Sequence, residues 1–326
     1  MQSTGFSHWL VVLVETFALL ALMLLAVAVL VLMATWVIDR NQTANAVLRN
    51  FPVIGHFRYW FLHLGEFFRQ YLYSSDREEL PFNRAQRVWV YRAAKNAENT
   101  NAFGSTRDLR AEGVPFFVNA PFPALGDHHV DAKPVRIGPY VREPYDHAAF
   151  FNISAMSFGA LSAPAVRALS IGAAKAGIWM DTGEGGLAPY HLEGGCDLVF
   201  EIGTAKYGVR TSDGKLDDDK LLAICAHRQV KMVSIKLGQG AKPGMGGLLP
   251  GAKVTEEIAA IRGIPVGEDS QSPNRHLDIA NVAQLMDAIA HIRELTGKPT
   301  GFKAVFGGMD WIEQLCDEVE LRGIES

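Results

Sequence analysis

The stretch "VKMVSIKLGQGAKPGMGG", Val230 to Gly247, joins a β-branched hydrophobic run to a glycine-rich continuation that carries positive charge. The first eight residues are typical of a buried strand. From Lys236 to Lys253 no acidic residue interrupts the lysines and glycines. Glycine lets the backbone approach a ligand closely, and a strand running into such a loop is where α/β proteins hold anions. The pattern predicts an anion-binding loop, with an ordinary surface loop as the alternative.

The chain from Phe151 onward alternates strand-like runs, glycine-rich turns and helical patterns. This alternation predicts parallel βαβ units, in a (β/α)8 barrel or in a doubly wound sheet. The segment yields only about four units, whereas a whole barrel has eight. We therefore expect residues 151–326 to form about the first half of a (β/α)8 TIM barrel, in a C-terminally truncated part of a longer protein. The strand-like runs are "FFNISAMSFG", "IWMD", "CDLVFEIG", "KYGVR", "VKMVSIKL" and "GFKAV"; the helical ones are "APAVRALSIGAAKAG", "TEEIAAIRG", "DIANVAQLMDAIAHIRELTG" and "WIEQLCDEVELRG".

The N-terminal segment is uncharged and apolar from Thr16 to Ile38. At ~1.5 Å per residue this run makes about 34 Å of helix, enough to cross a hydrocarbon core of roughly 30 Å. A signal peptide fits poorly, because residues 1–8 lack Lys and Arg. Arginines follow at 40, 49, 58 and 69, so the positive-inside rule places the N-terminus outside and the globular part in the cytoplasm. The sequence predicts a single-pass membrane protein with residues 1–40 as its anchor.

Residues 41–150 are predicted to be an amphipathic, loop-rich connecting region. Within it, the aromatic segment 51–73 is interrupted by charges, which predicts an amphipathic helix lying on a membrane surface or packed on the globular domain. A polar turn, a proline-containing loop and a short helix at "RAQRVWVYRAAKN" come next. Short strands are expected at "VPFFVN" and "PVRIGPYV".

Composition excludes several classes of protein. The net charge of −4 and the lack of an aromatic-basic stripe argue against a nucleic-acid partner. Cys196, Cys225 and Cys316 are too far apart for a disulfide framework or a CxxC site, and we expect them to be small buried hydrophobic residues. No metal site is predicted, because the pair His128-His129 has no carboxylate or cysteine at ligand spacing.

Chemically useful side chains follow consecutive predicted strands. "SAMSFGALS" offers backbone N–H groups and hydroxyls, and "DTGEGG" supplies two carboxylates. The opening loop adds Lys236, Gln239 and Lys242, and Arg262 follows on a predicted helix. Around one mouth, this set would suit an anionic, carbonyl-bearing substrate and a flat phosphorylated cofactor. Taken singly, Arg262 could be a surface helix residue and Glu184 a turn carboxylate.

Four motifs together, "MSFGALS", "DTGEGG", "KLGQGAKPGMGGLLPG" and "KVTEEIAAIRG", resemble the FMN-binding synthase domain of glutamate synthase. The likeness is greatest to the membrane-anchored branch, the FMN-binding glutamate synthase family proteins, to which "NFPVIGHFRYW" and "RAQRVWVYRAAKN" are also similar. It extends from about Asn50 to the end of the chain.

This resemblance implies a TIM-barrel flavoprotein oxidoreductase in which reduced FMN passes a hydride to 2-iminoglutarate, giving glutamate. Its partners would be a 2-oxoglutarate-like small molecule, the membrane and an electron-donor protein. A dicarboxylate needs two cationic anchors, and an arginine can clamp one of them bidentately. The implied catalytic residues are Glu184, beside the reacting carbon or ammonia, and Lys242; the implied substrate-binding residues are Gln239, Lys242 and Arg262; the implied cofactor-binding residues are Met156, Ser157, Thr182, Lys236 and Lys303.

The sequence departs from the family pattern in the opening loop. Met245 and Leu248 stand where the better-known enzymes have a glutamate and a glutamine, so a flavin oxidoreductase with another substrate is an alternative. The family's cysteine triplet for a 3Fe–4S cluster and its flavin-phosphate loop would lie beyond Ser326. Such a cluster is therefore expected only in a longer form, and a truncated, non-catalytic membrane protein is the remaining alternative.

Overall fold

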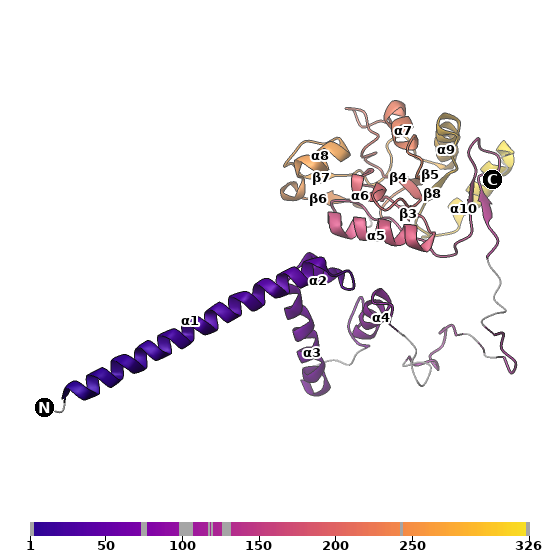
Figure 1. The fold of residues 1–326 in the computed structure, drawn as a ribbon. Coiled ribbons are helices and arrows are strands. Elements are labelled where there is room, and N and C mark those ends of the chain that lie inside the picture. Colours follow the sequence, from indigo (N-terminus) through magenta and orange to yellow (C-terminus); the bar gives the residue numbers. More distant parts are fainter. Residues whose placement is uncertain are drawn as a thin grey trace. The chain divides into compact units, whose positions relative to one another are not determined.

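The computed structural model describes residues 3–72, 77–97, 107–116, 118, 120–125, 132–241 and 244–323 (Figure 1). Contacts divide the chain into two compact units, Met1–Pro123 and Ala124–Ser326. This division, at residues 123 and 124, does not test the predicted boundaries at residues 40 and 150, which stay predictions.

All the regular secondary structure in the described part of the first unit is helical. Over Val11–Asn41, helix α1 is long and apolar enough to cross a membrane, by length and composition. Helices α3 and α4 confirm the helices expected in the aromatic segment and in "RAQRVWVYRAAKN". The elements are α1 (Ser3–Asn41), α2 (Ala46–Asn50), α3 (Ile54–Leu72) and α4 (Arg84–Ala94).

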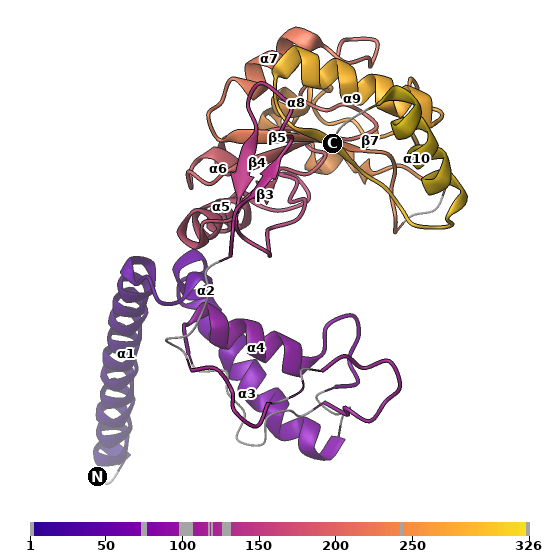
Figure 2. The same ribbon diagram turned by 90° about the vertical axis from the view of Figure 1, so that its right-hand side faces the viewer.

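A set of polar contacts fixes the junction of α1 with α3. The buried Asp39 carboxylate accepts the Val53 N–H at 2.8 Å and lies 2.9 Å from Nε2 of His56. At Gly55 the backbone packs so closely on α2 that a Cβ would meet Leu48 Cδ2 at 2.9 Å. As a result α3 turns away from the axis of α1 and does not run back beside it (Figures 1 and 2).

The second unit is built on a parallel sheet of four strands: β3 (Met180–Asp181), β4 (Leu198–Ile202), β5 (Val230–Lys236) and β8 (Thr300–Lys303). The run predicted at "FFNISAMSFG" enters the sheet only as a bridge from Ile153 to Met180. Strand order follows chain order, as it does around a (β/α)8 barrel, whereas a doubly wound sheet reverses at a switch point. Closure into a barrel remains a prediction.

Helices connect successive strands, and most of them lie where the sequence predicts. The predicted helix "APAVRALSIGAAKAG" is α5, and it ends at Gly177 in the left-handed conformation. The prediction of a strand at "KYGVR" is wrong, because Lys206 (φ 52°) and Gly208 (φ 82°) have left-handed backbone conformations that interrupt an extended run. Two helices were not expected, α6 and α7. The helices are α5 (Ala163–Ala176), α6 (Pro189–Leu192), α7 (Asp218–Cys225), α9 (Val282–Thr296) and α10 (Asp310–Arg322).

A long insertion between β5 and β8 covers the turns that follow β3 and β4. It holds the antiparallel pair β6 (Leu248–Leu249) and β7 (Ser270–Gln271), a 3-10 turn (Gly251–Lys253) and α8 (Glu256–Arg262). Its backbone accepts a hydrogen bond from Thr204 Oγ1 at Pro273 O (2.7 Å), and Asp278 pairs with Lys206 at 2.8 Å.

A short antiparallel hairpin, β1 (Val135–Ile137) with β2 (Tyr145–His147), precedes the parallel sheet. It confirms the strand predicted at "PVRIGPYV". No strand occurs at the described part of "VPFFVN", residues 114–116 and 118. The pair His128-His129 lies outside the described residues.

The core of the second unit lies between the sheet and its helices. All five residues of β4 are buried, which is typical of a parallel strand covered on both faces. Cys196 and Cys225 are buried as expected, but Cys316 is exposed on α10, which corrects the expectation for that residue. The core side chains include Val166, Leu198, Phe200, Leu221, Val233, Ile235, Leu285 and Ile289.

Candidate functional site

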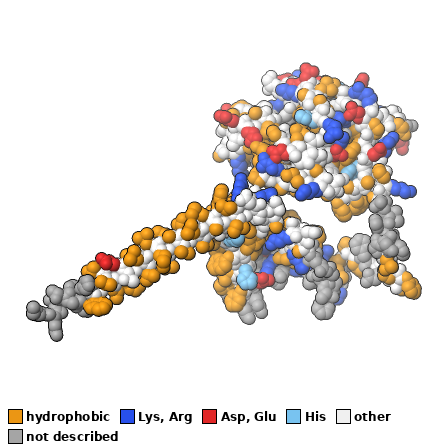
Figure 3. All heavy atoms as spheres, in the orientation of Figure 1, with side chains coloured by type: hydrophobic (Ala, Val, Ile, Leu, Met, Phe, Trp, Pro, Cys, Tyr) orange, Lys and Arg blue, Asp and Glu red, His pale blue; other side chains and the backbone are white. Residues whose placement is uncertain are grey.

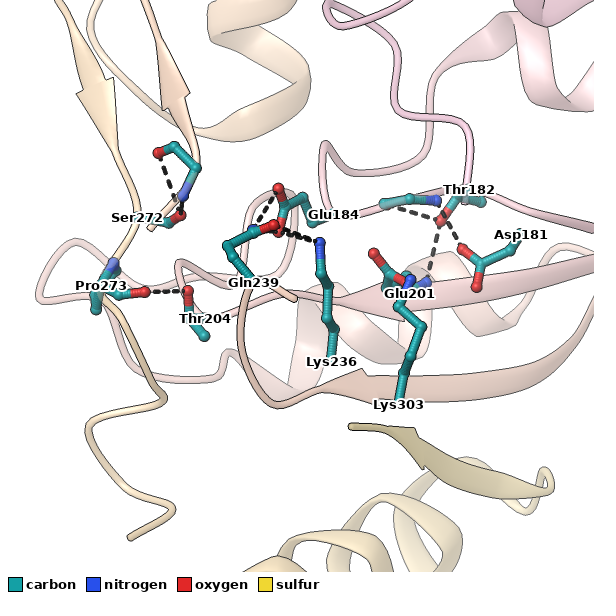
Figure 4. A network of polar contacts seen from close by, with 12 residues as sticks. Asp181, Thr182, Glu184, Glu201, Thr204, Lys236, Gln239, Ser272, Pro273 and Lys303 are labelled. Carbon is teal, nitrogen blue, oxygen red and sulfur yellow. Dashed lines mark hydrogen bonds and ion pairs between the residues drawn. The ribbon is translucent and has the colours of Figure 1, made fainter. Parts of the chain in front are cut away.

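Three predicted site residues meet at the carboxyl edge of the sheet (Figure 4). Glu184 follows β3, Lys236 ends β5, and Gln239 lies in the loop after it. Gln239 Nε2 donates to the two Glu184 oxygens at 2.8 and 2.6 Å, and Lys236 Nζ donates to Glu184 Oε2 at 3.1 Å. Lys236 Nζ also reaches Gln239 Oε1 at 3.1 Å. Since the carboxyl ends of parallel strands share one edge, residues more than fifty positions apart form one cluster.

Glycines make room for this cluster. A Cβ at Gly203 would lie 2.6 Å from Glu184 Cβ, and one at Gly247 would lie 3.0 Å from Glu184 Oε1. The side chains of Lys236 and Glu184 nevertheless keep 15% and 21% of their surface exposed. The cluster is therefore tightly packed from behind and accessible to a small solute.

A second, more buried pair of charges lies on the neighbouring strands. Lys303, at the end of β8, pairs with Glu201 of β4, whose side chain is completely buried. Glu201 Oε1 has no partner among the described residues. Glu201 was not a predicted site residue; the signal in the sequence was a carboxylate between the hydrophobic residues of "LVFEIG".

Asp181, at the end of β3, lies beside this pair and is 7% exposed. Burial, reinforced by the negative charge of Glu201, raises the pKa of Asp181 to about 7. The Gly183 N–H, 2.7 Å from Asp181 Oδ1, opposes that rise, as do the charges of Lys303 and Lys236. This carboxyl group can hold a proton near neutral pH.

The predicted cofactor-side loop is held by Asp181 and His191. The Met156 N–H donates to Asp181 O at 3.1 Å, and Met156 O accepts from His191 Nε2 at 2.9 Å. Ser157 packs on Gly183, where a Cβ would lie 2.3 Å from Ser157 Oγ. These contacts fix the backbone of the loop at the edge of the sheet.

Two buried histidines, absent from the sequence prediction, support the strand ends. His191 Nδ1 accepts the Ala188 N–H at 3.1 Å, so its Nε2 carries the proton donated to Met156. His276 Nε2 lies 2.9 Å from Lys236 O, while its Nδ1 has no partner among the described residues. Burial lowers the pKa of both imidazoles, which favours their neutral forms.

Thr182, predicted at the cofactor, is fully buried and serves the backbone. Its Oγ1 accepts the Glu201 N–H at 3.1 Å and donates to Gly183 O at 3.2 Å. Thr182 thereby links β3 to β4 behind the charged pairs. Any direct contact with a cofactor stays a prediction.

Arg262 is buried beside the same mouth, so its alternative role as a surface helix residue is wrong. Its Nη2 donates to Phe158 O at 3.0 Å, and its guanidinium lies 5.0 Å from the centre of the Tyr207 ring. Burial lowers the pKa of Arg262, while its interactions with Tyr207 and Glu184 act in the opposite direction. Its Nε is buried with no partner among the described residues, and one donor therefore remains for a ligand.

Lys242, predicted to act in catalysis and in substrate binding, lies outside the described residues. The structure thus brings together Glu184, Lys236 and Gln239, and it places Arg262 within the electrostatic reach of Glu184. Lys303 belongs to the adjacent pair with Glu201.

A cavity of about 730 Å³ runs along the sheet from hairpin β1–β2 to the second charged pair. Its charged lining residues are Arg136 of the hairpin, Arg293 of α9, Asp181 and Lys303, and Val199 and Ser234 of the sheet line its wall. Glu184 and Gln239 are not among its lining residues, so the cavity and the Glu184 cluster are neighbouring features that share the sheet.

These features define a parallel α/β protein with a glycine-lined site of paired lysines and carboxylates at the carboxyl edge of its sheet. Residues 130–313 match the family described as a conserved region in glutamate synthase, which is more than half of the chain, and the chain belongs to that family.

Individual relatives agree with this assignment. The chain is 34% identical over 347 residues to a glutamate synthase large subunit-like protein, YerD, of Bacillus subtilis (strain 168), covering 94% of this chain and 66% of that relative. It is 41% identical over 152 residues to an archaeal-type glutamate synthase [NADPH] of Thermotoga sp. (strain RQ2), covering 46% and 27%. A glutamate synthase large subunit-like protein of Rhizobium meliloti (strain 1021) is 33% identical over 157 residues, covering 48% and 33%. The chain thus spans less than two thirds of each of these relatives.

Proposed function

We propose that the chain is a membrane-anchored, FMN-dependent oxidoreductase of the glutamate synthase type, forming glutamate from 2-oxoglutarate and ammonia or glutamine nitrogen. The observation that carries this proposal is the cluster of Glu184, Lys236 and Gln239 at adjacent strand ends. In the proposal α1 is the membrane anchor, the second unit is cytoplasmic, and an electron-donor protein supplies reducing equivalents.

The residues at the sheet edge fit the ring system of a flavin. FMN, when bound, supplies the hydride. Lys236 and Lys303 are cations suited to the polar edge of the reduced ring, where negative charge accumulates. The buried Glu201 Oε1 has no partner among the described residues and is an acceptor for a ring N–H. In the proposal Met156 and Ser157 line the ring, and Thr182 supports it through the backbone of β4.

The substrate-side residues complement a dicarboxylate. Arg262 offers its free Nε–H, and Gln239 and Lys242 are the other proposed anchors. Glu184 is negatively charged when it accepts hydrogen bonds from Lys236 and Gln239, and in that form it attracts ammonium and takes up its proton. The proposed catalytic residues are therefore Glu184 and Lys242, with Lys236 keeping Glu184 oriented.

The test is an anaerobic assay of the full-length protein in detergent, reconstituted with FMN and reduced before 2-oxoglutarate and ammonium are added. Glutamate formation and flavin reoxidation should both occur, and Glu184→Gln should reduce the rate by roughly 100-fold or more because the general base is lost. Glu193→Gln is the matched control, since Glu193 pairs with Arg167 on the surface. Flavin binding without glutamate formation would reject the substrate, and protein that binds no flavin would reject the whole proposal.

The alternative substrate is supported by two exposed apolar side chains beyond Gln239, one in the loop and one at the start of β6. Met245 and Leu248 are 53% and 51% exposed. A 2-oxo acid with an apolar side chain would contact them better than a dicarboxylate does. Reoxidation of the flavin by 2-oxoisocaproate and not by 2-oxoglutarate would favour this alternative.

A further inference from the structure

Helix α3 has an unusual distribution of exposed side chains. At 100° per residue, five of its large apolar residues fall on one side of the helix. Four of them keep 57–72% of their surface exposed and Phe68 keeps 38%, although such side chains are normally buried. The residues on this side, called the aromatic face below, are Ile54, Phe57, Trp60, Phe61 and Phe68.

Helix α4 packs on the opposite side of α3. Leu62, His63 and Glu66 of α3 and Val88 and Tyr91 of α4 line a shared hollow of about 270 Å³. The Arg58 guanidinium also lies over the Tyr91 ring and donates to its hydroxyl. In a water-soluble pair of helices the apolar sides would face each other. Here α3 instead turns its side of mixed polarity toward α4. Among the described residues of the first unit, none buries the aromatic face.

The position of α3 in the chain indicates what covers this face. It starts at Ile54, after a segment of twelve residues (42–53) that includes the short helix α2 and follows α1, the helix suited to crossing a membrane, and the Asp39 contacts hold that junction. Because α3 turns away from the axis of α1, a membrane-crossing α1 would set α3 along the bilayer surface (Figures 1 and 2). Hydrophobic side chains cover α1 and gather over α3 in the space-filling view (Figure 3).

Charge around α3 points to the same partner. Residues 39–97 contain nine Lys and Arg against five Asp and Glu, although the whole chain has a net charge of −4. Segments that combine exposed aromatic side chains with excess basic residues bind the surface of anionic bilayers.

We propose that α3 lies in the interface of an anionic lipid bilayer, with its aromatic face at the boundary between headgroups and acyl chains and with α4 on the water side. The first unit is then held to the membrane by two elements, and α3 fixes its rotation about the axis of α1. This inference rests on the proposed membrane anchoring by α1.

The experiment uses the full chain in vesicles of phosphatidylcholine and phosphatidylglycerol, with single nitroxide labels in a cysteine-free background. Phe57→Cys and Phe61→Cys report the aromatic face, His63→Cys is the matched control on the opposite side, and Leu24→Cys reports α1. Each label is tested for collision with oxygen, which concentrates in lipid, and with a water-soluble nickel chelate. We expect the Phe57 and Phe61 labels to favour oxygen at least about threefold over the His63 label, at a depth shallower than the Leu24 label.

The other outcomes overturn the inference in distinguishable ways. If the Phe57, Phe61 and His63 labels meet the nickel chelate equally while the Leu24 label reports lipid, α1 anchors the chain but α3 does not lie on the bilayer. Phe57 and Phe61 labels shielded from both reagents would mean that protein covers the face, and spin–spin broadening would identify a second copy. A Leu24 label exposed to the nickel chelate would remove the membrane anchor itself.

Discussion

Replacing Asp181 by Asn should change how the stability of the protein depends on pH. The pKa of Asp181 is about 7 in the folded protein, mainly because of burial, and an unfolded aspartate has a pKa of about 3.9. Between these values the folded state holds a proton that the unfolded state has lost. Stability therefore falls as pH rises through this window and levels off above pH 7.

The size of the effect follows from linkage. With one extra proton bound by the folded state, the free energy of unfolding falls by about 1.4 kcal/mol per pH unit. From pH 5 to pH 7 the two pKa values give a loss of about 2 kcal/mol from Asp181 alone. Asp181→Asn removes this contribution, so the difference between variant and wild type should grow by that amount over the same interval.

The assay is urea unfolding of the full chain in mild detergent at pH 5, 6 and 7, followed by near-ultraviolet circular dichroism. Glu268→Gln removes the same charge at an exposed position, and it should leave the wild-type pH dependence in place. If the free energies of unfolding of Asp181→Asn and wild type change equally with pH over the three values, the raised pKa assigned to Asp181 is refuted.

Three further perturbations test the site. Lys303→Met leaves the buried Glu201 without its counter-ion and should lower the free energy of unfolding by about 2 kcal/mol. The loss is smaller than the ~3–5 kcal/mol of a fully buried pair because the Lys303 side chain is 42% exposed. Adding Glu201→Gln to the Lys303→Met variant should restore most of this stability, measured as the urea midpoint. Gly203→Ala puts a Cβ 2.6 Å from Glu184 Cβ and should lower kcat/KM for glutamate formation by roughly 100-fold, while Gly172→Ala, with open space around its Cβ, should not. Burial lowers the pKa of His276, so the folded protein resists protonation of this residue and loses stability as the pH falls below about 6.5. His276→Gln should reduce the loss of stability between pH 6.5 and 5.5 by roughly 1 kcal/mol. The same decrease in melting temperature over this interval in the variant and the wild type would contradict this.

Local patterns were sufficient to predict much of the second unit. The helix α9 has both a helical period and an Asn281 cap, and β5 is a continuous apolar run, so each is specified by its own residues. The meeting of Glu184 with Gln239 was also predictable, because both follow strands of a parallel sheet and therefore share its edge.

The features that the sequence did not reveal depend on contacts between distant segments. "KYGVR" has the alternation of a strand, yet Tyr207 and Val209 are buried by turns and by the insertion. Glu201 has its role only because Lys303, about a hundred residues later, reaches it. Nothing in the local sequence distinguishes His276 from other loop histidines, and its role follows from the contact of its imidazole with the backbone carbonyl of Lys236. Residue type alone predicts none of these pairings.

The sequential strand order has a consequence for how the protein is made. Strand β4 pairs with β3, and β5 pairs with β4, so each of them joins the strand synthesised just before it and the sheet can assemble in step with the ribosome. Strand β8 is the exception, because it must wait for the whole insertion between residues 237 and 299 to be translated. Until then the acidic side chain of Glu201 lacks its lysine. Burying an unpaired carboxylate is unfavourable, so the packing around Glu201 can be completed only after β8 has been made.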